Sequence, residues 1–254
     1  METKSKIIND IAKNFKAASF SKVLVLVGSA IKKRTVKNVD ILLITSRNIH
    51  DKDIFKIVDK EYFIGKYNDC YTFNIKNILF NITAVSIKDF DIYFNKILKQ
   101  KELEPSYRNW CLGYFIPEAF LGDLKDSEVI FQKIDFIKKY KNKLIKYPKN
   151  LKIEIIKNSL NDLEIKEKLF NKAFKKNDYI LKVTAISDIL FISFRALSAK
   201  KETYFKGLFN YREVLENYSK LRLLIEKIKK NISKNKELNI LIKNYLKETR
   251  KLLK

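Results

Sequence analysis

The sequence predicts an α+β protein, with an N-terminal mixed sheet and flanking helices followed by a C-terminal helical bundle. Continuous apolar runs rich in β-branched residues are concentrated before Phe90, and apolar residues at helical spacing dominate after it. The chain has 254 residues, 46% of them hydrophobic, which is enough to bury a core. We therefore expect an α/β domain over residues 1–95 and a helical domain with basic C-terminal helices over residues 96–254.

The N-terminal elements follow from the apolar pattern. Residues 7–20 predict a helix, because their apolar side chains recur at helical spacing. Val23–Val27 and Val39–Ile44 are continuous apolar runs, which predict strands buried on both faces. The segment DKDIFKIVDKEYF predicts a short helix. Two further strands, CYTFNI and ILFNITAVSI, are expected to pair through a hairpin turn at Lys76 and Asn77.

Helical patterns fill the second half, with Pro105, Pro117 and Pro148 as boundaries. Asp178 is a good N-cap for YILKVTAISDILFISFRALSA, an unusually apolar helix that we expect at the buried centre of this half. The tail, residues 219–254, carries twelve basic and three acidic residues among apolar residues at helical spacing. It predicts one or two basic amphipathic helices.

The net charge of +24 favours a polyanionic partner such as RNA, DNA or a nucleotide. Only seven of the 53 basic residues are Arg, however, although Arg is the residue best suited to gripping phosphates. The chain is also rich in Asn and Ile, as AT-rich coding would produce. Charge alone therefore leaves two interpretations open, specific nucleic-acid binding and a compositional bias without function.

The two cysteines, Cys70 and Cys111, lack the spacing of a zinc site, and His50 is the only histidine. We expect both to be buried thiols in a reducing compartment. The apolar run Val23–Val27 is too short for a signal peptide, and no run approaches the length of a membrane span. The expected location is the cytoplasm, with no membrane partner.

The strongest functional pattern is Gly28-Ser29 at a strand end, followed by a strand that carries Asn38 and Asp40. A Gly-Ser turn offers backbone N–H groups and a hydroxyl to phosphates. Side chains at i and i+2 of a strand point the same way, so two carboxylates there, with a third on a neighbouring strand, would form an oxygen cage for Mg²⁺. Paired metals of this kind support phosphoryl-group transfer.

The stretch VGSAIKKRTVKNVDILLI resembles the signature of the polymerase-β-like nucleotidyltransferase superfamily. The resemblance implies that Gly28 and Ser29 grip the triphosphate, that Asn38 and Asp40 stand on the first and second metal-ligand positions, and that Asn81 stands on the third. The segments YPKNLKIEIIKNSL and LFNKAFKKNDYILKVTAISDILFISFRALSAKK are similar to the helical C-terminal domain of small aminoglycoside-nucleotidyltransferase-like proteins. The family would use Mg²⁺ and an NTP and transfer a nucleoside monophosphate to a small hydroxylated acceptor.

Two of the three ligand positions are Asn, so Mg²⁺ should bind weakly or not at all, with Asp40 as the remaining ligand and catalytic carboxylate. Phosphates could still be held by Ser29 and basic residues of the following loop, of which we single out Lys33 and Arg34. Lys206, after the apolar helix, is a further candidate for phosphate binding.

Each of these residues also has a structural interpretation. Gly28-Ser29 fits an ordinary turn, Asp40 a loop cap or a lysine partner, and Asn38 and Asn81 fit hydrogen-bonding residues.

Residues outside the motif have similar alternatives. Asp188 and Arg195 lie seven apart on one helix face and favour a structural ion pair, Lys206 favours solvent, and His50 favours a surface loop over a catalytic base.

Two functional hypotheses stand beside an active nucleotidyltransferase. One is a catalytically inactive member that binds nucleotide, RNA or a protein partner. The other is a structural or toxin–antitoxin-type interaction module, in which the charge reflects genome composition only.

Overall fold

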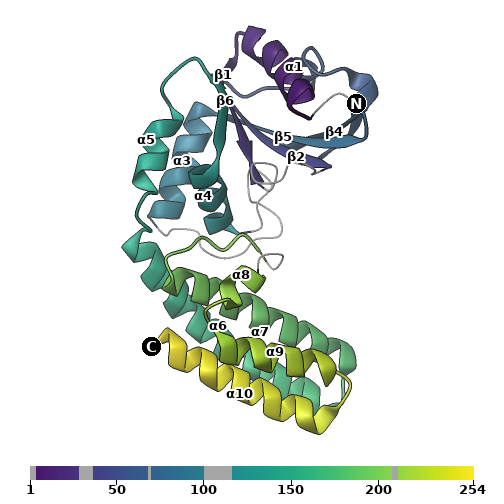
Figure 1. Ribbon diagram of the computed structural model, residues 1–254, viewed down its shortest axis with the longest axis vertical. Helices are drawn as coiled ribbons and strands as arrows, with labels where there is room; N and C mark the ends of the chain where they lie inside the picture. Colours follow the sequence, from purple (N-terminus) through teal and green to yellow (C-terminus); the bar gives the residue numbers. More distant parts are fainter. Residues whose placement is uncertain (1–3, 29–36, 68–69, 100–115, 208–210) are drawn as a thin grey trace. The chain divides into compact units, whose positions relative to one another are not determined.

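A computed structural model describes residues 4–28, 37–67, 70–99, 116–207 and 211–254. By its contacts the chain divides into two compact units, Met1–Lys146 and Tyr147–Lys254 (Figure 1). The first holds a sheet and helices, and the second is helical, so the predicted α+β class is confirmed.

The first unit is built on a six-stranded sheet with the strand order β3-β4-β5-β2-β1-β6. Within it β2 and β5 run parallel, while the other neighbouring pairs are antiparallel, which makes the sheet mixed, as expected. The strands have the following bounds: β1 Ser21–Val27, β2 Asn38–Thr45, β3 Phe63–Tyr67, β4 Cys70–Ile75, β5 Ile78–Ser86 and β6 Glu128–Gln132.

Helices cover both faces of this sheet (Figure 1). On one face lies α1 (Lys4–Ala17), whose Phe15 is fully buried in a core with Leu24 of β1 and Ile41 of β2. On the other face lie α3 (Ile87–Leu98) and α4 (Pro117–Asp126), followed in the chain by α5 (Ile137–Lys143). A cluster of aromatic rings joins these three helices: Phe90, Phe94, Phe120, Phe136 and Tyr140.

The hairpin prediction is confirmed, and the helix predicted just before it is only partly right. Lys76 and Asn77 have positive φ angles of 52° and 63°, as a tight two-residue turn between antiparallel strands requires. The segment expected to be one helix contains only α2 (Asp51–Ile54) and the short 3₁₀ helix η2 (Lys60–Tyr62). Its last residue, Phe63, begins strand β3, which the apolar pattern did not reveal because that strand alternates poorly and lies at the sheet edge.

The boundary between the units differs from the expected division after residue 95. Residues 117–146 belong to the first unit, because β6 pairs with the free side of β1 and α4 packs against β1. Strand β6, five residues at the sheet edge, departs from the expectation that the chain after Phe90 is helical.

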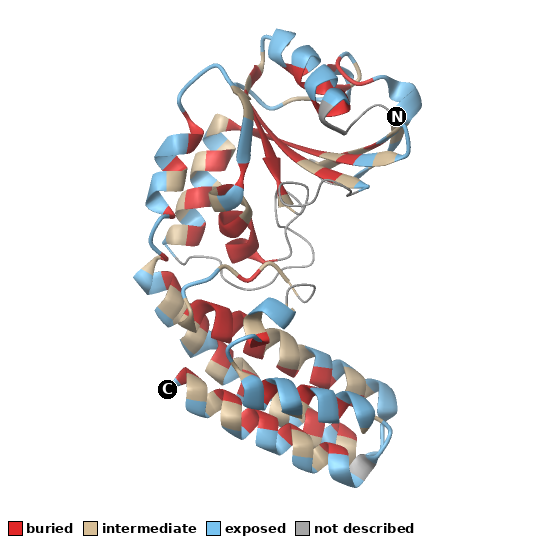
Figure 2. Cartoon of the chain, viewed as in Figure 1, coloured by how far each residue is buried: buried red, intermediate tan, exposed pale blue. Residues whose placement is uncertain are grey.

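The second unit is a helical bundle in which α6, α7, α9 and α10 pack together. Asp178 caps α7 as predicted, since its side chain accepts a hydrogen bond from the backbone N–H of Leu181. The basic tail forms two helices, α9 and α10, each with one buried apolar face, although Leu223 and Ile240 are exposed. The lysines of both helices are exposed, and Figure 2 shows buried and exposed positions alternating along them. The bounds are α6 Lys149–Lys175, α7 Tyr179–Lys200, α8 Tyr211–Leu215, α9 Ser219–Lys230 and α10 Asn235–Leu253.

Two charged residues of α7, Asp188 and Arg195, lie within the helical bundle. Asp188 forms an ion pair of 2.8 Å with Lys166 of α6, and Arg195 is buried in the same unit. Among the helices of the described ranges, none is both long and apolar enough to cross a membrane.

Candidate functional site

Three side chains named by the motif converge on one face of the sheet. Asp40 lies directly beside Asn81 in the parallel pairing of β2 with β5, and Asn38 precedes Asp40 by two residues. Strand alternation therefore turns all three to the same side. Thr72 of β4 lies beside Asn81 on the other flank and shares this face.

Hydrogen bonds connect the four side chains into a network. The amide nitrogen of Asn81 donates to Oδ1 of Asp40 at 2.9 Å and to Oδ1 of Asn38 at 3.0 Å. The hydroxyl of Thr72 donates to Oδ1 of Asn81 at 3.0 Å, and the amide of Asn38 donates to Oδ1 of Asp40 at 3.5 Å. Asn81 is the centre of this network, because its side chain contacts each of the other three residues.

Gly28 belongs to the same site through its contact with Asp40. Its φ is +72°, a backbone conformation that residues other than glycine rarely adopt. A Cβ atom added there would lie 2.9 Å from Oδ2 of Asp40. The residue opposite Asp40 in the β1–β2 pairing is Val27, directly before Gly28. The glycine thus lets the end of β1 pass closely beside the carboxylate.

The electrostatic setting of Asp40 disfavours its charged form. Burial raises the pKa of Asp40, the hydrogen bond from Asn81 lowers it, and charge repulsion from Asp123 of α4 raises it further. Burial also raises the pKa of the Cys70 thiol, with a smaller contribution from Asp40. Neither Asp123 nor Cys70 is among the site residues that the sequence motif predicts.

Only one of these two residues could have been found from the sequence. Cys70 precedes Thr72 by two residues, so strand alternation alone places it on the site face once β4 is paired with β5. Asp123 lies on a helix without any motif, and only the packing of α4 on β1 brings it near Asp40.

Comparison with solved structures gives the fold a known counterpart. A nucleotidyltransferase-like protein from Exiguobacterium sibiricum matches with a TM-score of 0.52 and 13% identity, over 98% of this chain and 73% of that protein. The chain has a nucleotidyltransferase-like fold. An aminoglycoside 6-adenyltransferase from Bacillus subtilis also matches, with a TM-score of 0.30 and 12% identity, over 100% of this chain and 92% of that protein. No protein-family model and no curated protein sequence matches the chain.

The nucleotidyltransferase-like fold raises the question of whether these side chains suit Mg²⁺. A metal needs lone pairs that point at it, and carboxylates supply the charge that holds it. Asp40 is the one carboxylate of the network, and the Asn81 amide turns hydrogens, not oxygen, toward it. Within the described ranges no group of three or more acidic, histidine or cysteine side chains could hold a metal ion. The donors as arranged fit Mg²⁺ poorly.

Of the other candidates for phosphate binding or catalysis, Lys206 and His50 lie in the part of the chain that the structure describes. Ser29, Lys33 and Arg34 lie outside the described residues. Lys206 is half-buried in the second unit, between α7 and α8. His50 is exposed at the start of α2, where its backbone N–H donates to Asp53 at 2.9 Å, so the surface-loop interpretation fits its position.

Proposed function

We propose that this chain is a nucleotidyltransferase-fold protein that binds a nucleoside triphosphate beside the Asn38, Asp40 and Asn81 face with little help from divalent metal. Transfer of a nucleoside monophosphate to an acceptor is very slow or absent. The observation that supports this is the donation of Asn81 to both Asn38 and Asp40. The amide hydrogens of Asn81 bind the side-chain oxygens of Asn38 and Asp40, which a metal ion would otherwise bind.

The close approach of Gly28 to Asp40 supports a retained ligand site. A strand end that needs a positive φ and contacts a half-buried carboxylate is more specific than an ordinary turn. A triphosphate without a metal would be repelled by ionised Asp40, and burial shifts the pKa of Asp40 in the direction that lessens this repulsion.

Thermal unfolding with nucleotide tests the proposal. ATP and GTP should each raise the melting temperature of the wild-type protein, and the increase should be the same in EDTA as in Mg²⁺. Protection that requires Mg²⁺ would overturn the metal-independent site, and absence of protection in both buffers would overturn nucleotide binding. A transfer assay with radiolabelled ATP should show no more product for wild type than for Asp40→Ala.

RNA binding is a second candidate, favoured by a row of lysines on α10. Five exposed lysines, four in α10 and one at its C-cap, repeat at spacings of 7, 4, 4 and 3 residues, which places the four helical ones along one side of the helix. They are Lys236, Lys243, Lys247, Lys251 and Lys254. We call this set the α10 lysine row. Of the two acidic residues of this helix, Glu248 pairs with Lys220 of α9, and Glu237 lies in the first turn next to Lys236.

Binding of a single-stranded oligoribonucleotide at several salt concentrations tests this second candidate. The affinity should fall by about tenfold or more between 50 and 200 mM salt, because the lysines release counterions from phosphates. Replacing Lys243, Lys247 and Lys251 by Glu should reduce both the affinity and the salt dependence.

A matched control has the same charge change at exposed lysines of the first unit, Lys52, Lys88 and Lys138. Equal losses in the two triple variants would indicate that net charge alone, not the α10 lysine row, determines binding.

A further inference from the structure

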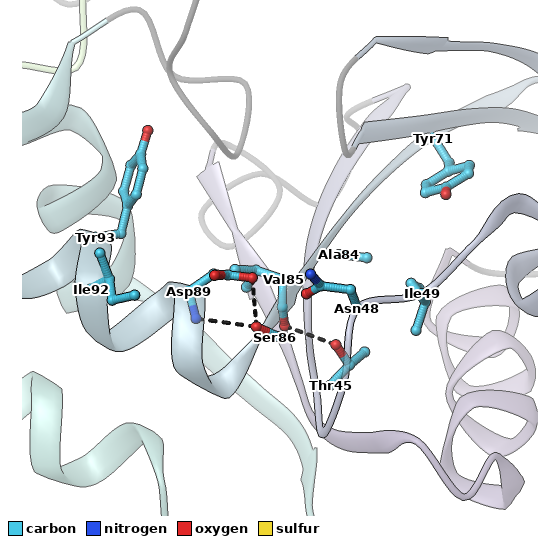
Figure 3. Close-up of a pocket in the computed structure, with 10 residues that line it drawn as sticks. All are labelled: Thr45, Asn48, Ile49, Tyr71, Ala84, Val85, Ser86, Asp89, Ile92 and Tyr93. Atoms are coloured by element: carbon cyan, nitrogen blue, oxygen red, sulfur yellow. Dashed lines mark hydrogen bonds between the residues drawn. The ribbon is translucent and has the colours of Figure 1, made fainter.

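A second site candidate is a cavity of about 320 Å³ at the carboxyl ends of β2 and β5 (Figure 3). Thr45 ends β2, and Ala84 and Ser86 lie at the end of β5. Thr45 follows Asp40 by five residues and Ala84 follows Asn81 by three, so alternation places both on the opposite face of the sheet from the Asp40 network. The cavity is therefore distinct from the nucleotide site proposed above.

The topology of the sheet explains why a cavity forms there. β2 and β5 are parallel neighbours, but the chain leaves them toward opposite faces. After β2 it enters α2, whose Ile54 packs in the core with α1. After β5 it enters α3, whose Phe90 packs against Phe120 and Tyr140 on the other face. Open sheets bind ligands in the crevice left at such a divergence of parallel strands.

The walls of the cavity combine apolar surface with one carboxylate. Ile49 and Tyr71 lie on one side, Ile92 and Tyr93 on the other, and Asp89 is the only charged side chain among the described lining residues (Figure 3). This carboxylate is an exception in a chain whose net charge is +24.

Asp89 is held in a fixed position at the cavity. Its Oδ2 accepts a hydrogen bond of 2.6 Å from the hydroxyl of Ser86, and its backbone N–H donates to the same hydroxyl at 3.1 Å. Its Oδ1 has no hydrogen-bond partner in the part of the chain that the structure describes. From the opposite wall the amide of Asn48 points toward Asp89 and Ser86 (Figure 3). The polar groups of Asp89 and Asn48 thus point into a cavity that is otherwise lined mainly by apolar side chains, as in small-molecule sites.

We propose that this cavity binds a small organic amine, with its ammonium group on Asp89 and Asn48 and a ring-sized apolar body against Ile49, Ile92 and Tyr93. An ammonium group suits the carboxylate, which would repel an anion of the same size. The volume of about 320 Å³ accommodates such a ligand. This inference does not depend on nucleotide binding at the Asp40 face.

Three probes of nearly equal shape separate charge from apolar burial: phenethylamine, phenethyl alcohol and hydrocinnamate. Calorimetric titration of the full chain should give saturable binding of the amine, binding of the alcohol roughly tenfold weaker or more, and none of the carboxylate. Equal binding of amine and alcohol, preferential binding of the carboxylate, or no binding of the amine would overturn the proposal.

Variants locate the site. Asp89→Asn keeps the backbone N–H that donates to the Ser86 hydroxyl. It should reduce the affinity for the amine roughly tenfold or more and leave the affinity for the alcohol unchanged. Asp10→Asn removes the same charge from exposed α1 and should change neither. Ile92→Trp, at a position that is 46% exposed and therefore tolerant, should fill the cavity and weaken both ligands. Unchanged amine binding in Asp89→Asn or Ile92→Trp would contradict the assignment.

Discussion

Asn81 donates a hydrogen bond of 2.9 Å from its amide nitrogen to Oδ1 of Asp40, across the parallel pairing of β5 with β2. The opposite amide orientation would place two oxygens against each other and would lose the bond from Thr72 to Oδ1 of Asn81. With Asp40 ionised, the network therefore has Asn81 as the donor to Asp40. A metal bound by the carbonyl oxygen of Asn81 would have to reverse that amide and break its three hydrogen bonds, to Asp40, to Asn38 and from Thr72.

Restoring carboxylates should recreate a metal site if the rest of the nucleotide site is intact. In the double variant Asn38→Asp, Asn81→Asp the donor amides are lost and three carboxylates face one another, so their repulsion should lower the melting temperature in EDTA. Mg²⁺ should recover that loss in the variant and have no effect on wild type. Calorimetry should then show Mg²⁺-dependent binding of ATP or GTP by the variant only.

A control variant should rule out a general effect of added charge. Asn74→Asp, Asn142→Asp adds the same two charges at exposed positions and should not respond to Mg²⁺. If the restored site gains no metal-dependent binding, the cleft has diverged beyond these two positions or never bound nucleotide.

Asp40 should make stability depend on pH in a defined direction. Its folded pKa lies above the ordinary value of 3.8, so the folded state binds this proton more tightly than the unfolded state does. The stabilising contribution is complete below the ordinary value and is lost as pH rises through the folded pKa. Asp40→Asn should therefore raise the melting temperature at pH 7, and the gain should shrink toward zero as the pH falls below 3.8.

Melting curves of wild type and Asp40→Asn, recorded from below pH 3.8 up to pH 7, provide the measurement. Asp10→Asn, an exposed residue that pairs with Lys13, is the control and should change stability little at either end. A variant less stable than wild type at pH 7 would mean that a cation compensates Asp40 in the folded protein.

The β strands that form the site could be predicted, because each is a long apolar run and Lys76-Asn77 has strong turn chemistry. The convergence of Asn38, Asp40 and Asn81 followed from the two-residue period of strands and the motif spacing. For these strands and these three residues, the pattern within each segment is sufficient to predict the structure.

Local pattern was not sufficient where a residue's role depends on distant partners. β6 is short and half-exposed, and only its pairing with β1 makes it a strand. Asp123 reaches the site through the packing of α4, and Asp188 pairs with Lys166 of another helix. No spacing within a single segment encodes such contacts.

Gly28 should resist substitution because of Asp40. Gly28→Ala forces a side chain into a positive φ and places its Cβ 2.9 Å from Oδ2 of Asp40, so it should destabilise the fold by about 1–3 kcal/mol. In an Asp40→Ala background the close contact is absent, and the cost of Gly28→Ala should be smaller.

Urea unfolding of the two single variants and the double variant measures this coupling. Gly65→Ala is a matched control, because an added Cβ at Gly65 meets nothing within 4 Å. Equal costs of Gly28→Ala in both backgrounds would show that the backbone conformation alone, not Asp40, requires the glycine.

The first unit should fold only when residues beyond 95 are included. The ring of Phe90 packs edge-on against Phe120, Phe136 and Tyr140 at centroid distances of 5.5, 5.2 and 4.9 Å, and β6 covers the outer side of β1. A fragment of residues 1–95 loses all of these partners, which leaves large aromatic rings and a strand edge exposed.

A fragment of residues 1–146 keeps them and should unfold cooperatively on heating, with sheet and helix signals in its circular dichroism spectrum. The shorter fragment should show no cooperative transition and should aggregate. If residues 1–95 melted cooperatively with a native-like spectrum, β6 and the aromatic partners would be dispensable, and the boundary expected from the sequence would describe the folding unit.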